Sequence, residues 1–550
     1  MGKDQNTHLR ALGGLNQFNP VNWFCTISRL YHSTPQEKIM KSKTIVLPVL
    51  LAALCTLSSA GGFTLQNNTL ETAGSRPNIV LILSDDMGYG QPGFNGGNRA
   101  LTPNMDRICR EGARLKQFYT HSVCAPTRAA ILTGRYAFRT WSDWRSEDFG
   151  KPSYLKKLGL TLATGSDGLT TRRIHALDTG ERTVAEALKE AGYFTSIIGK
   201  WHCGEWLKEH LPMQQGFMHQ YGHYAWGIDY NTFMIPHNAP VPFHVYDWHR
   251  NEKPLQEQGY STDLIANEFE RVIAEQNDQR PFFIYVPFNA VHGPIDVVPR
   301  HTENFSARDA ALKCYDDAVG RIVAAIEKHG FRDNTLLICT NDNGGLTEAS
   351  NRPFRGTKNT TYEGGVRVPC LMRWPGKLKP GSELNAMMHV VDLFSTFVNL
   401  AGGSLEQPRP LDSLNMSAAL FNGHDSPRNE IIYDVTGCVR IPTIRSGDFK
   451  LMGNRLYNIA NDPTERTDVA DQHPDVVSRL AARLAEAGAE RPPLGDKPLL
   501  MEPRLPYVYG RDENHNPPKW LIDSVNSARA RQPQSWPDGK TPWPQAPQDR

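Results

Sequence analysis

The chain has 550 residues, of which 39% are hydrophobic and 9% aromatic, a composition typical of a globular protein with room for one large and one smaller domain. Lys and Arg number 60 and Asp and Glu 58, so the formal net charge is only +2. Because no long run of basic residues occurs, the sequence does not favour a nucleic acid as a partner. An anionic ligand would therefore have to be attracted by a local site.

The N-terminal region has the order of a secretory signal peptide. Lys41 and Lys43 precede a short apolar run, and small residues follow it up to Ala60. We therefore expect a signal peptide at residues 40–60 and, at residues 1–39, a leader that is not part of the native protein. The apolar run is short for a membrane span, so an anchoring helix is the less favoured alternative. The sequence thus predicts an exported protein, periplasmic or secreted, with no stable membrane span.

The chain contains nine cysteines, and two of them, Cys25 and Cys55, lie in the part expected to be removed. The other seven are scattered without paired spacing, which does not indicate a disulfide or zinc framework. Since seven is odd, at least one thiol of an exported protein would have no partner.

Four continuous apolar runs, each next to a cluster of polar residues, predict strands that are buried on both faces. They cover residues 78–83, 193–198, 281–286 and 335–340. Helical periodicity occurs between them, most clearly at residues 183–191 and 310–328. The alternation predicts an α/β catalytic domain over residues 76–404, with a large, mostly parallel central sheet flanked by helices. Ligands of such sheets bind at the carboxyl ends of the strands.

The region after this domain has a different pattern. Residues 405–490 contain short predicted strands and a helix at 474–487, which indicates a smaller α+β domain with a short antiparallel sheet. From residue 491 to 550 Pro and Trp recur without periodicity, so we expect an irregular tail. The polar, glycine-punctuated stretch 142–180 is expected to be an insertion near the mouth of the site.

Two polar clusters that end predicted strands offer only oxygen ligands. Asp85 and Asp86 follow the first strand, and Asp342 and Asn343 follow the last. Hard oxygen donors of high charge suit Ca²⁺ or Mg²⁺, whereas zinc would require His or Cys. One such pair alone is more often a solvated loop, but two pairs at strand ends predict a metal site.

Cys124 stands where a helix is expected to begin. Pro126 suits a first helical turn and Gly134 is a natural helix end. Free backbone N–H groups and the helix dipole favour an anion at such a position. The alternative is a small buried cysteine with no chemical role.

The run Cys124-Ala125-Pro126-Thr127-Arg128, followed by Leu132-Thr133-Gly134-Arg135, resembles the signature of type I, formylglycine-dependent sulfatases. Thr127 stands where the best-known form of that signature has Ser. The resemblance covers roughly residues 76–480, and further motifs follow in the family order: Ser84-Asp85-Asp86-Met87-Gly88-Tyr89-Gly90, Gly199-Lys200-Trp201-His202-Cys203-Gly204, Ala290-Val291-His292, Asn341-Asp342-Asn343-Gly344-Gly345, Arg355-Gly356-Thr357-Lys358 and Tyr362-Glu363-Gly364-Gly365-Val366-Arg367.

This resemblance implies an alkaline-phosphatase-like sulfatase fold in which Cys124 is oxidised to formylglycine (3-oxoalanine) by a maturation enzyme. It also implies one Ca²⁺ per chain, held by Asp85, Asp86, Asp342 and Asn343. One hydroxyl of the hydrated aldehyde attacks sulfur and the other later expels sulfate, an exit that an ordinary Ser or Cys lacks. The implied supporting residues are Arg128, Lys200 and Lys358 for the diol and the sulfate oxygens, Asp342 to assist the attack, His292 as the general acid and His202 as the base of the second step.

Two further segments, residues 222–230 and 259–263, are similar to those of arylsulfatase B-like members. By analogy they indicate a sulfated N-acetylgalactosamine or related sugar, or an aryl sulfate, as substrate. Trp226, Asp229 and His249 are weaker candidates for sugar contacts, and core packing is the favoured role for Trp226.

We therefore predict hydrolysis of sulfate esters with release of inorganic sulfate. The alternatives are a phosphodiester or phosphonate monoester hydrolase of the same superfamily, and a carbohydrate-binding protein without activity. A two-metal phosphatase is not favoured, because no second metal set with His can be assembled from the sequence.

Overall fold

The computed structural model describes residues 76–140, 163–164, 171–172, 176–205, 208–235, 246–295, 297–435, 441–490 and 519–530. The leader and signal peptide expected at residues 1–60, most of the insertion expected at 142–180 and much of the C-terminal tail lie outside the described residues. Within the part that is described, no helix has the length and apolar character needed to cross a membrane.

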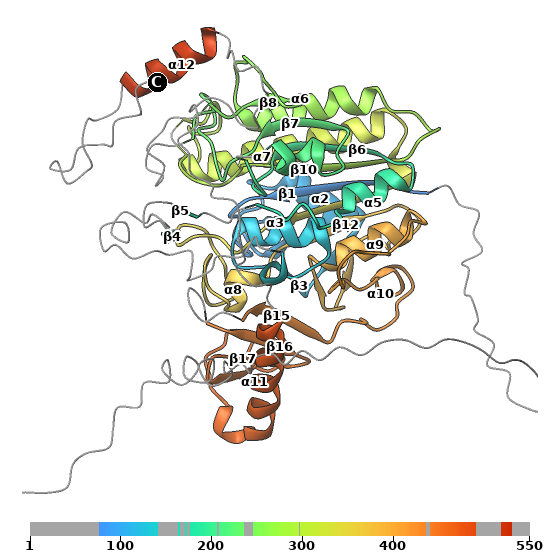
Figure 1. Cartoon of the computed structure of the whole chain (residues 1–550), viewed down its shortest axis with the longest axis vertical. Helices are drawn as coiled ribbons and strands as arrows, with labels where there is room; N and C mark the ends of the chain where they lie inside the picture. The colour runs from blue at the N-terminus through green and yellow to red at the C-terminus, as the bar shows by residue number, and fades with distance from the viewer. Residues whose placement is uncertain are drawn as a thin grey trace, which may run out of the picture. The chain divides into compact units, whose positions relative to one another are not determined.

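A ten-stranded sheet with the order β13-β2-β12-β11-β1-β10-β6-β7-β8-β9 lies at the centre of the fold (Figure 1). Its five central strands run parallel. They are β11 (Thr335–Asn341), β1 (Asn78–Ser84), β10 (Phe282–Pro287), β6 (Phe194–Lys200) and β7 (His219–His223). Four of the five were predicted from continuous apolar runs, and the prediction of a mostly parallel sheet is confirmed.

The sheet becomes antiparallel toward its edges. β12 pairs antiparallel with β11 and with β2, and β8 pairs antiparallel with β7 and with β9, while β13 runs parallel to β2. The bounds of these strands are β12 (Cys370–Arg373), β2 (Ala113–Leu115), β13 (Ser382–Leu384), β8 (His249–Arg250) and β9 (Lys253–Pro254).

Strand β1 explains why the apolar runs are continuous. Ile79, Leu81 and Leu83 enter one hydrophobic core, whereas Val80 and Ile82 enter a second core on the opposite face of the sheet. Because successive side chains of a strand point to opposite faces, a sheet covered on both sides needs apolar residues at every position.

Helices cover both faces of the sheet (Figure 1). One core is closed by α2 (Pro103–Glu111), α6 (Ser261–Ala274) and α7 (Ala307–Lys328), and the other by α3 (Cys124–Thr133), α5 (Val184–Glu190) and α9 (Asp392–Leu400). The two helices predicted from periodicity are α5 and α7. Their first turns are capped by Thr183 and Ser306, whose hydroxyls accept hydrogen bonds from the N–H groups of Glu186 and Asp309.

The C-terminal part forms a four-stranded antiparallel sheet, β15 (Glu430–Asp434), β16 (Thr443–Ser446), β17 (Phe449–Met452) and β18 (Arg455–Asn458), covered by α11 (Pro474–Ala489). The smaller C-terminal sheet domain is therefore confirmed. Its apolar residues, among them Ile444, Leu451 and Leu480, continue the core that contains α3 and α9. Short elements complete the fold: β3 (Phe118–Tyr119), β14 (Met388–His389), β4 (Ala163–Thr164), β5 (Thr171–Arg172), α8 (Glu363–Val366) and α10 (Ser417–Phe421).

One expectation for the tail is wrong. Residues 491–550 were expected to be irregular, but Lys519–Ala530 forms helix α12. An ion pair of 2.6 Å between Lys519 and Asp523 links its first two turns, Leu521 is buried, and Trp520 contacts the ring of Tyr246. The proline-rich sequence before and after this helix concealed its pattern.

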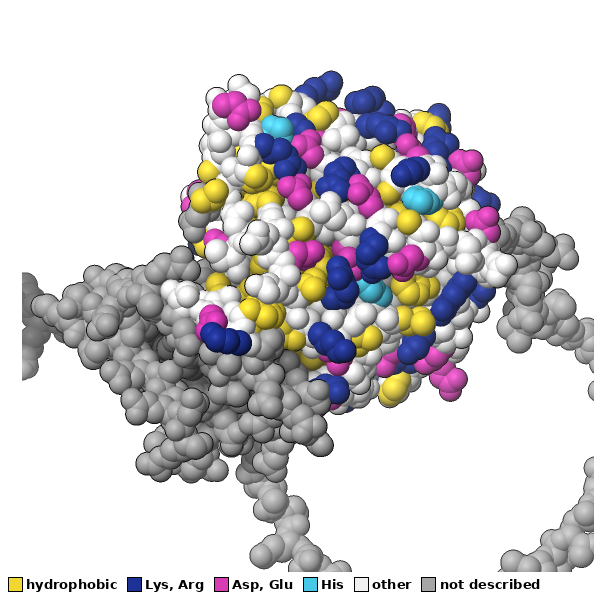
Figure 2. Space-filling model, turned by 90° about the horizontal axis from the view of Figure 1, so that it is seen from above, with side chains coloured by type: hydrophobic (Ala, Val, Ile, Leu, Met, Phe, Trp, Pro, Cys, Tyr) yellow, Lys and Arg dark blue, Asp and Glu magenta, His cyan; other side chains and the backbone are white. Residues whose placement is uncertain are grey.

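Charges are mixed on the face seen in Figure 2, where Lys and Arg side chains lie among Asp and Glu side chains. This distribution agrees with the small net charge of the chain. Any strong attraction for an anion must therefore arise inside a local site.

Candidate active site

The carboxyl ends of the parallel strands bring the polar clusters of the sequence together. Ser84 at the end of β1 is in register with Asn341 at the end of β11, so Asp85 and Asp342 follow at neighbouring positions. Lys200 is the last residue of β6, and His292 follows β10. All four positions lie at the edge where ligands of α/β sheets bind, as the sequence predicts.

Cys124 is the first residue of α3, and its helix ends where the sequence predicts. Gly134 adopts a left-handed φ of 66° and its N–H donates to the carbonyl of Ala130 at 3.0 Å. The Cys124 Sγ and carboxylate oxygens of Asp85 and Asp342 lie within 4.8 Å of one another. All ten residues of α3 are buried. The cysteine thus faces the acidic cluster from the start of an enclosed helix.

Thr127 lies in α3, three residues after Cys124, and holds the loop that precedes this helix. Its hydroxyl accepts a hydrogen bond from the N–H of His121 at 3.1 Å and donates to the carbonyl of His121 at 3.3 Å. Both bonds need only a hydroxyl at this position, which Ser would also supply.

Three cations surround the carboxylates. Arg128 donates to Asp85 at 3.1 Å and to Asp342 at 2.9 Å, and Lys200 Nζ lies 2.5 Å from Asp85. Lys358 Nζ lies 2.6 Å from Asp86 Oδ1. Arg128, Lys200 and the three aspartates are fully buried. Buried charges at these distances stabilise one another only as a set, since removing one leaves another uncompensated.

The predicted metal ligands retain oxygen atoms without partners. Asp85 Oδ1, Asp86 Oδ2 and Asn343 Oδ1 are buried, and none accepts a hydrogen bond from the described residues. Asn343 is oriented by its amide group, which donates to Asp86 Oδ1 at 2.7 Å. Buried carboxylate and amide oxygens without donors are costly unless a cation satisfies them. This donor set fits a hard divalent cation such as Ca²⁺.

The pKa values of the three groups nearest the helix start diverge. Burial raises the pKa of Asp85, but Lys200, His292 and Arg128 outweigh it and hold the pKa well below its usual range. Burial and the neighbouring Asp85 raise the pKa of Asp342 to about 7. Burial also raises the pKa of the Cys124 thiol, despite Lys200 and Lys358. A cysteine that acts as a nucleophile needs the opposite shift, so unmodified Cys124 is poorly suited to that role.

His292 lies next to Asp86 at the edge of the charged cluster. Its Nε2 lies 3.7 Å from Asp86 Oδ2, and its Nδ1 lies 2.5 Å from the carbonyl oxygen of Gly293. Burial and the charge of Lys358 lower its pKa to about 4. The ring of Trp226 meets the His292 ring edge-on, with centroids 5.5 Å apart.

The remaining candidate residues are placed differently. His202 is buried at a left-handed φ of 56°, two residues beyond Lys200, and its N–H donates to the carbonyl of Tyr224. Asp229 Oδ1 accepts from the N–H groups of Asn231 and Thr232 and so closes a turn. His249 is buried and stacks on Tyr224. Asp229 and His249 therefore serve the structure of this loop, and their suggested role as sugar contacts is not supported.

Sequence reasoning missed Arg308. Its guanidinium donates to the backbone carbonyl of Asp86 at 2.8 Å and thereby fixes the peptide that directly follows the two acidic residues. Arg308 lies in the first turn of α7, where no motif surrounds it, so only the tertiary contact identifies it.

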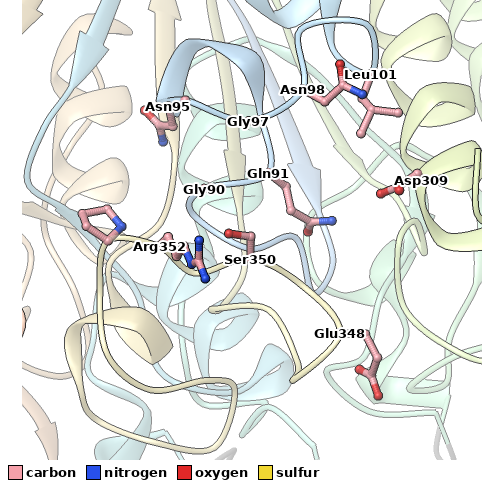
Figure 3. Close-up of a pocket in the computed structure, with 12 residues that line it drawn as sticks. Gly90, Gln91, Asn95, Gly97, Asn98, Leu101, Asp309, Glu348, Ser350 and Arg352 are labelled. Atoms are coloured by element: carbon pink, nitrogen blue, oxygen red, sulfur yellow. The ribbon is translucent and has the colours of Figure 1, made fainter.

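An open cavity of about 480 Å³ adjoins the segment that follows the acidic pair (Figure 3). Gly90 and Gln91 form one wall, Ser350 and Arg352 another, and Asp309 borders it from α7. The two walls are joined by a hydrogen bond of 2.8 Å from the N–H of Gly90 to the carbonyl of Ser350. The lining of this cavity is therefore polar, with both hydrogen-bond donors and acceptors.

A sequence profile described as Sulfatase matches residues 77–404, more than half of the chain. The chain belongs to the sulfatase family. A second profile, described as the C-terminal region of N-sulphoglucosamine sulphohydrolase, matches residues 356–490 of this sulfatase. The predicted family and fold class are thereby confirmed.

Curated relatives of this sulfatase include arylsulfatase J of Mus musculus, 27% identical over 76% of each chain. N-acetylgalactosamine-6-sulfatase of Rattus norvegicus is 32% identical over 70% of this chain and 71% of the relative. The enzyme is therefore a sulfuric ester hydrolase of the arylsulfatase type, as predicted.

Solved structures agree with this fold. Ps i-CgsB in complex with k-i-k-neocarrahexaose has a TM-score of 0.64 and 27% identity, and covers 76% of this sulfatase and 94% of that chain. The PsFucS1 sulfatase from Pseudoalteromonas sp. has a TM-score of 0.62 and 24% identity, with coverage of 76% and 91%.

Proposed function

We propose that this sulfatase hydrolyses sulfate esters of carbohydrates through a formylglycine formed from Cys124, with one Ca²⁺ bound by Asp85, Asp86, Asp342 and Asn343. The observation that carries the proposal is the set of buried ligand oxygens without donors beside three buried cations and the start of α3.

Charge balance supports an anionic substrate at this position. The carboxylates of Asp85, Asp86 and Asp342 and the cations Arg128, Lys200 and Lys358 cancel formally. A divalent cation would leave a local excess of positive charge, which favours a sulfate ester and the negative charge that develops on its oxygens. Since the site is closed to water on most sides, these interactions are stronger than they would be at the surface.

The residues around position 124 would have different roles in the reaction, according to their positions. Ca²⁺ would polarise the sulfate group, and the hydrated aldehyde would supply the attacking hydroxyl. Arg128, Lys200 and Lys358 orient the sulfate oxygens, and Asp342, which lies beside the start of α3, accepts the proton of the attacking hydroxyl. His292 donates a proton to the leaving alcohol, and His202 takes up the proton of the second hydroxyl. The assignment of His202 rests on its motif in the sequence.

Because the pKa of His292 is low, the proposed mechanism predicts how turnover changes with pH. A general acid must hold its proton, so turnover should decline as the pH rises. The negative charge of a bound ester beside the ring raises its pKa and so extends the active range upward.

The relatives support carbohydrate as the substrate class, because one is named for N-acetylgalactosamine 6-sulfate and one solved neighbour holds a carbohydrate. Maturation then requires an enzyme that oxidises Cys124, and the signal-like sequence at residues 40–60 supports export to the periplasm or beyond.

The test is a parallel assay of protein purified from its native host, in which a peptide mass spectrum reports the state of residue 124. We expect formylglycine at that position and higher kcat/KM on 6-sulfated N-acetylgalactosamine and on an aryl sulfate than on aryl phosphate or phosphonate esters. A fully alkylatable thiol at position 124, or preference for the phosphorus esters, would contradict the proposal.

A further inference from the structure

The loop that carries Trp226 is fixed by hydrogen bonds at both ends, and one end is bound to the segment that carries His292. At its start, the N–H groups of Tyr224 and Ala225 donate to the buried carboxylate of Asp247, at 3.0 and 2.7 Å. At its end, the Tyr230 hydroxyl donates to the carbonyls of Asn289 and His292, at 3.1 and 2.8 Å. The loop is thus tied to the segment that carries His292, and its side chains hold a defined position relative to that ring.

Close packing brings the loop onto His292. A Cβ atom at Gly227 would lie 3.4 Å from His292 Nδ1 and 3.6 Å from Asn289 Oδ1, both ordinary van der Waals distances, so the backbone at Gly227 runs directly beside the ring. Trp226 precedes this glycine, and its indole contacts His292 edge-on at 5.5 Å between centroids with an interplanar angle of 61°. The indole therefore borders the space in front of His292.

Trp226 differs from the well-buried tryptophans of the same region. Trp201 and Trp248 are about 1% and 0% exposed, and their indole N–H groups donate to the carbonyl of His210 and to the carboxylate of Glu257. Trp226 is only partly buried: it packs against the core that contains α3 and α9, and its N–H donates to none of the residues that the structure describes. Buried Tyr and Trp residues normally satisfy their polar group, so a partly exposed indole without a protein acceptor can contact a ligand as well as the core.

Given the proposed function, the geometry of proton transfer fixes the position of the leaving group. When the S–O bond breaks, its electron pair stays on the ester oxygen, and this oxygen takes the proton of His292 at hydrogen-bond distance. The carbon skeleton of the alcohol must then lie within van der Waals reach of the surface beside His292, and Trp226 forms that surface.

We propose that Trp226 binds the ring of the leaving alcohol, so that the enzyme selects sulfate esters of pyranose sugars by stacking their C–H face on the indole. The free N–H then donates to a ring hydroxyl or to an acetamido carbonyl. This inference rests on the proposed function and adds the residue that selects the alcohol, whereas the charged residues bind only the sulfate group.

The test compares ligands that carry the ring with one that does not. In Trp226→Ala we expect kcat/KM on 6-sulfated N-acetylgalactosamine to fall about ten- to hundredfold, while the inhibition constant of inorganic sulfate changes less than about twofold. Trp226→Phe, which keeps an aromatic face but lacks the N–H, should recover most of the activity on an aryl sulfate and only part of that on the sugar. Trp520→Ala, at another half-buried tryptophan, is the matched control and should change neither quantity.

Two results would overturn the inference. One is an unchanged kcat/KM on the sugar in a folded Trp226→Ala; the other is a loss of sulfate inhibition in proportion to the loss of turnover, which indicates general damage to the site. If the melting curve shows that Trp226→Ala is unfolded, the test rests on Trp226→Phe, whose kcat/KM is compared on the aryl and the sugar substrate. An equal loss of kcat/KM on both substrates contradicts the inference. These results can be distinguished from a failure of the proposed function, because in that case the unmutated enzyme would hydrolyse no sulfate ester.

Discussion

Two of the buried charge clusters that the described residues form are built differently. The first surrounds Cys124. The second joins the catalytic domain to the C-terminal sheet, where Lys450 Nζ lies 3.0 Å from Glu363 Oε1 and 2.8 Å from Glu465 Oε1. The other oxygens of these two glutamates accept hydrogen bonds from the Tyr119 hydroxyl at 2.8 Å and from the N–H of Glu363 at 2.7 Å. Lys450, Glu363 and Glu465 are fully buried, as are the aspartates of the active site.

The difference lies in what remains unsatisfied. In the Lys450 cluster each carboxylate oxygen has a hydrogen-bond or ion-pair partner: Glu465 Oε1 accepts no hydrogen bond, but it lies 2.8 Å from Lys450 Nζ. In the Cys124 cluster Asp85 Oδ1 and Asn343 Oδ1 have neither kind of partner among the described residues, and Asp86 Oδ2 has only His292 Nε2, at 3.7 Å. Burial alone therefore does not identify a functional charge cluster, whereas unsatisfied oxygens of one chemical type do. The first cluster should respond to metal and substrate, and the second only to unfolding.

The largest expected effect is chemical and confined to the first cluster. Cys124→Ala should reduce turnover by at least about four orders of magnitude without changing the melting temperature by more than a few degrees, because the nucleophile precursor is lost and only a small buried side chain is shortened. Cys109→Ala, at a partly buried cysteine outside the site, is the control and should remain active. Substantial residual turnover of the Cys124 variant would refute the nucleophile assignment.

Breaking the second cluster should cost stability and spare the chemistry. Lys450→Met removes the cation that Glu363 and Glu465 share and leaves only Arg367, 3.3 Å from Glu363, which costs about 3–5 kcal/mol of unfolding free energy for a buried pair. Denaturant unfolding measures this change, and Lys328→Met, at an exposed lysine, is the control. The activity per folded molecule should stay within about twofold. A loss below about 1 kcal/mol would mean that the cluster contributes little.

Calcium should affect the first cluster and not the second. Since only the folded chain presents the ligand set, Ca²⁺ at a hundredfold excess over its dissociation constant should add about 2.7 kcal/mol to the unfolding free energy, and chelation should remove this gain together with turnover. Asn343→Ala should abolish the calcium increment, whereas Lys450→Met should keep it. An increment that survives Asn343→Ala would place the metal elsewhere.

The smallest expected effect concerns His223, a fully buried residue at the end of β7 whose two ring nitrogens have no partner among the described residues. Burial, together with the charges of Lys200 and Arg128, lowers its pKa to about 3, although Asp247 opposes the shift. The unfolded chain binds a proton near pH 6.5, so stability falls as the pH decreases from about 6.5 toward 3.

This penalty is about 1 kcal/mol between pH 6 and pH 5 for a single group. His223→Gln should reduce the loss by that amount in unfolding curves recorded at the two pH values. Equal pH dependence in the variant and the unmutated protein would show that His223 is already protonated or solvated.

The strand ends and the start of α3 could be predicted because their signals are local. Apolar runs fix the parallel strands, and Pro126 and Gly134 mark the bounds of the helix that begins at Cys124. Since parallel strands end at one edge, Asp85, Lys200 and Asp342 could be placed together without any structure.

The rest depends on contacts between distant segments. Glu363 stands in a sulfatase motif, yet its partner Lys450 is 87 residues away in a strand of the second sheet. Trp226 packs against the core, as expected, but its position 5.5 Å from the His292 ring depends on contacts such as the hydrogen bond from Tyr230 to the His292 carbonyl. Neither contact leaves a periodic trace in the sequence.

The enclosure of α3 has a consequence for the order of events during biogenesis. Cys124, Thr127 and the other residues of this helix are inaccessible in the folded chain, and the Thr127 hydroxyl is already bonded to His121. An oxidising enzyme could not bind the signature as an extended peptide after these contacts have formed. The conversion proposed for Cys124 must therefore precede folding of the sheet around it. The yield of active protein then depends on whether Cys124 is oxidised before the newly made chain folds.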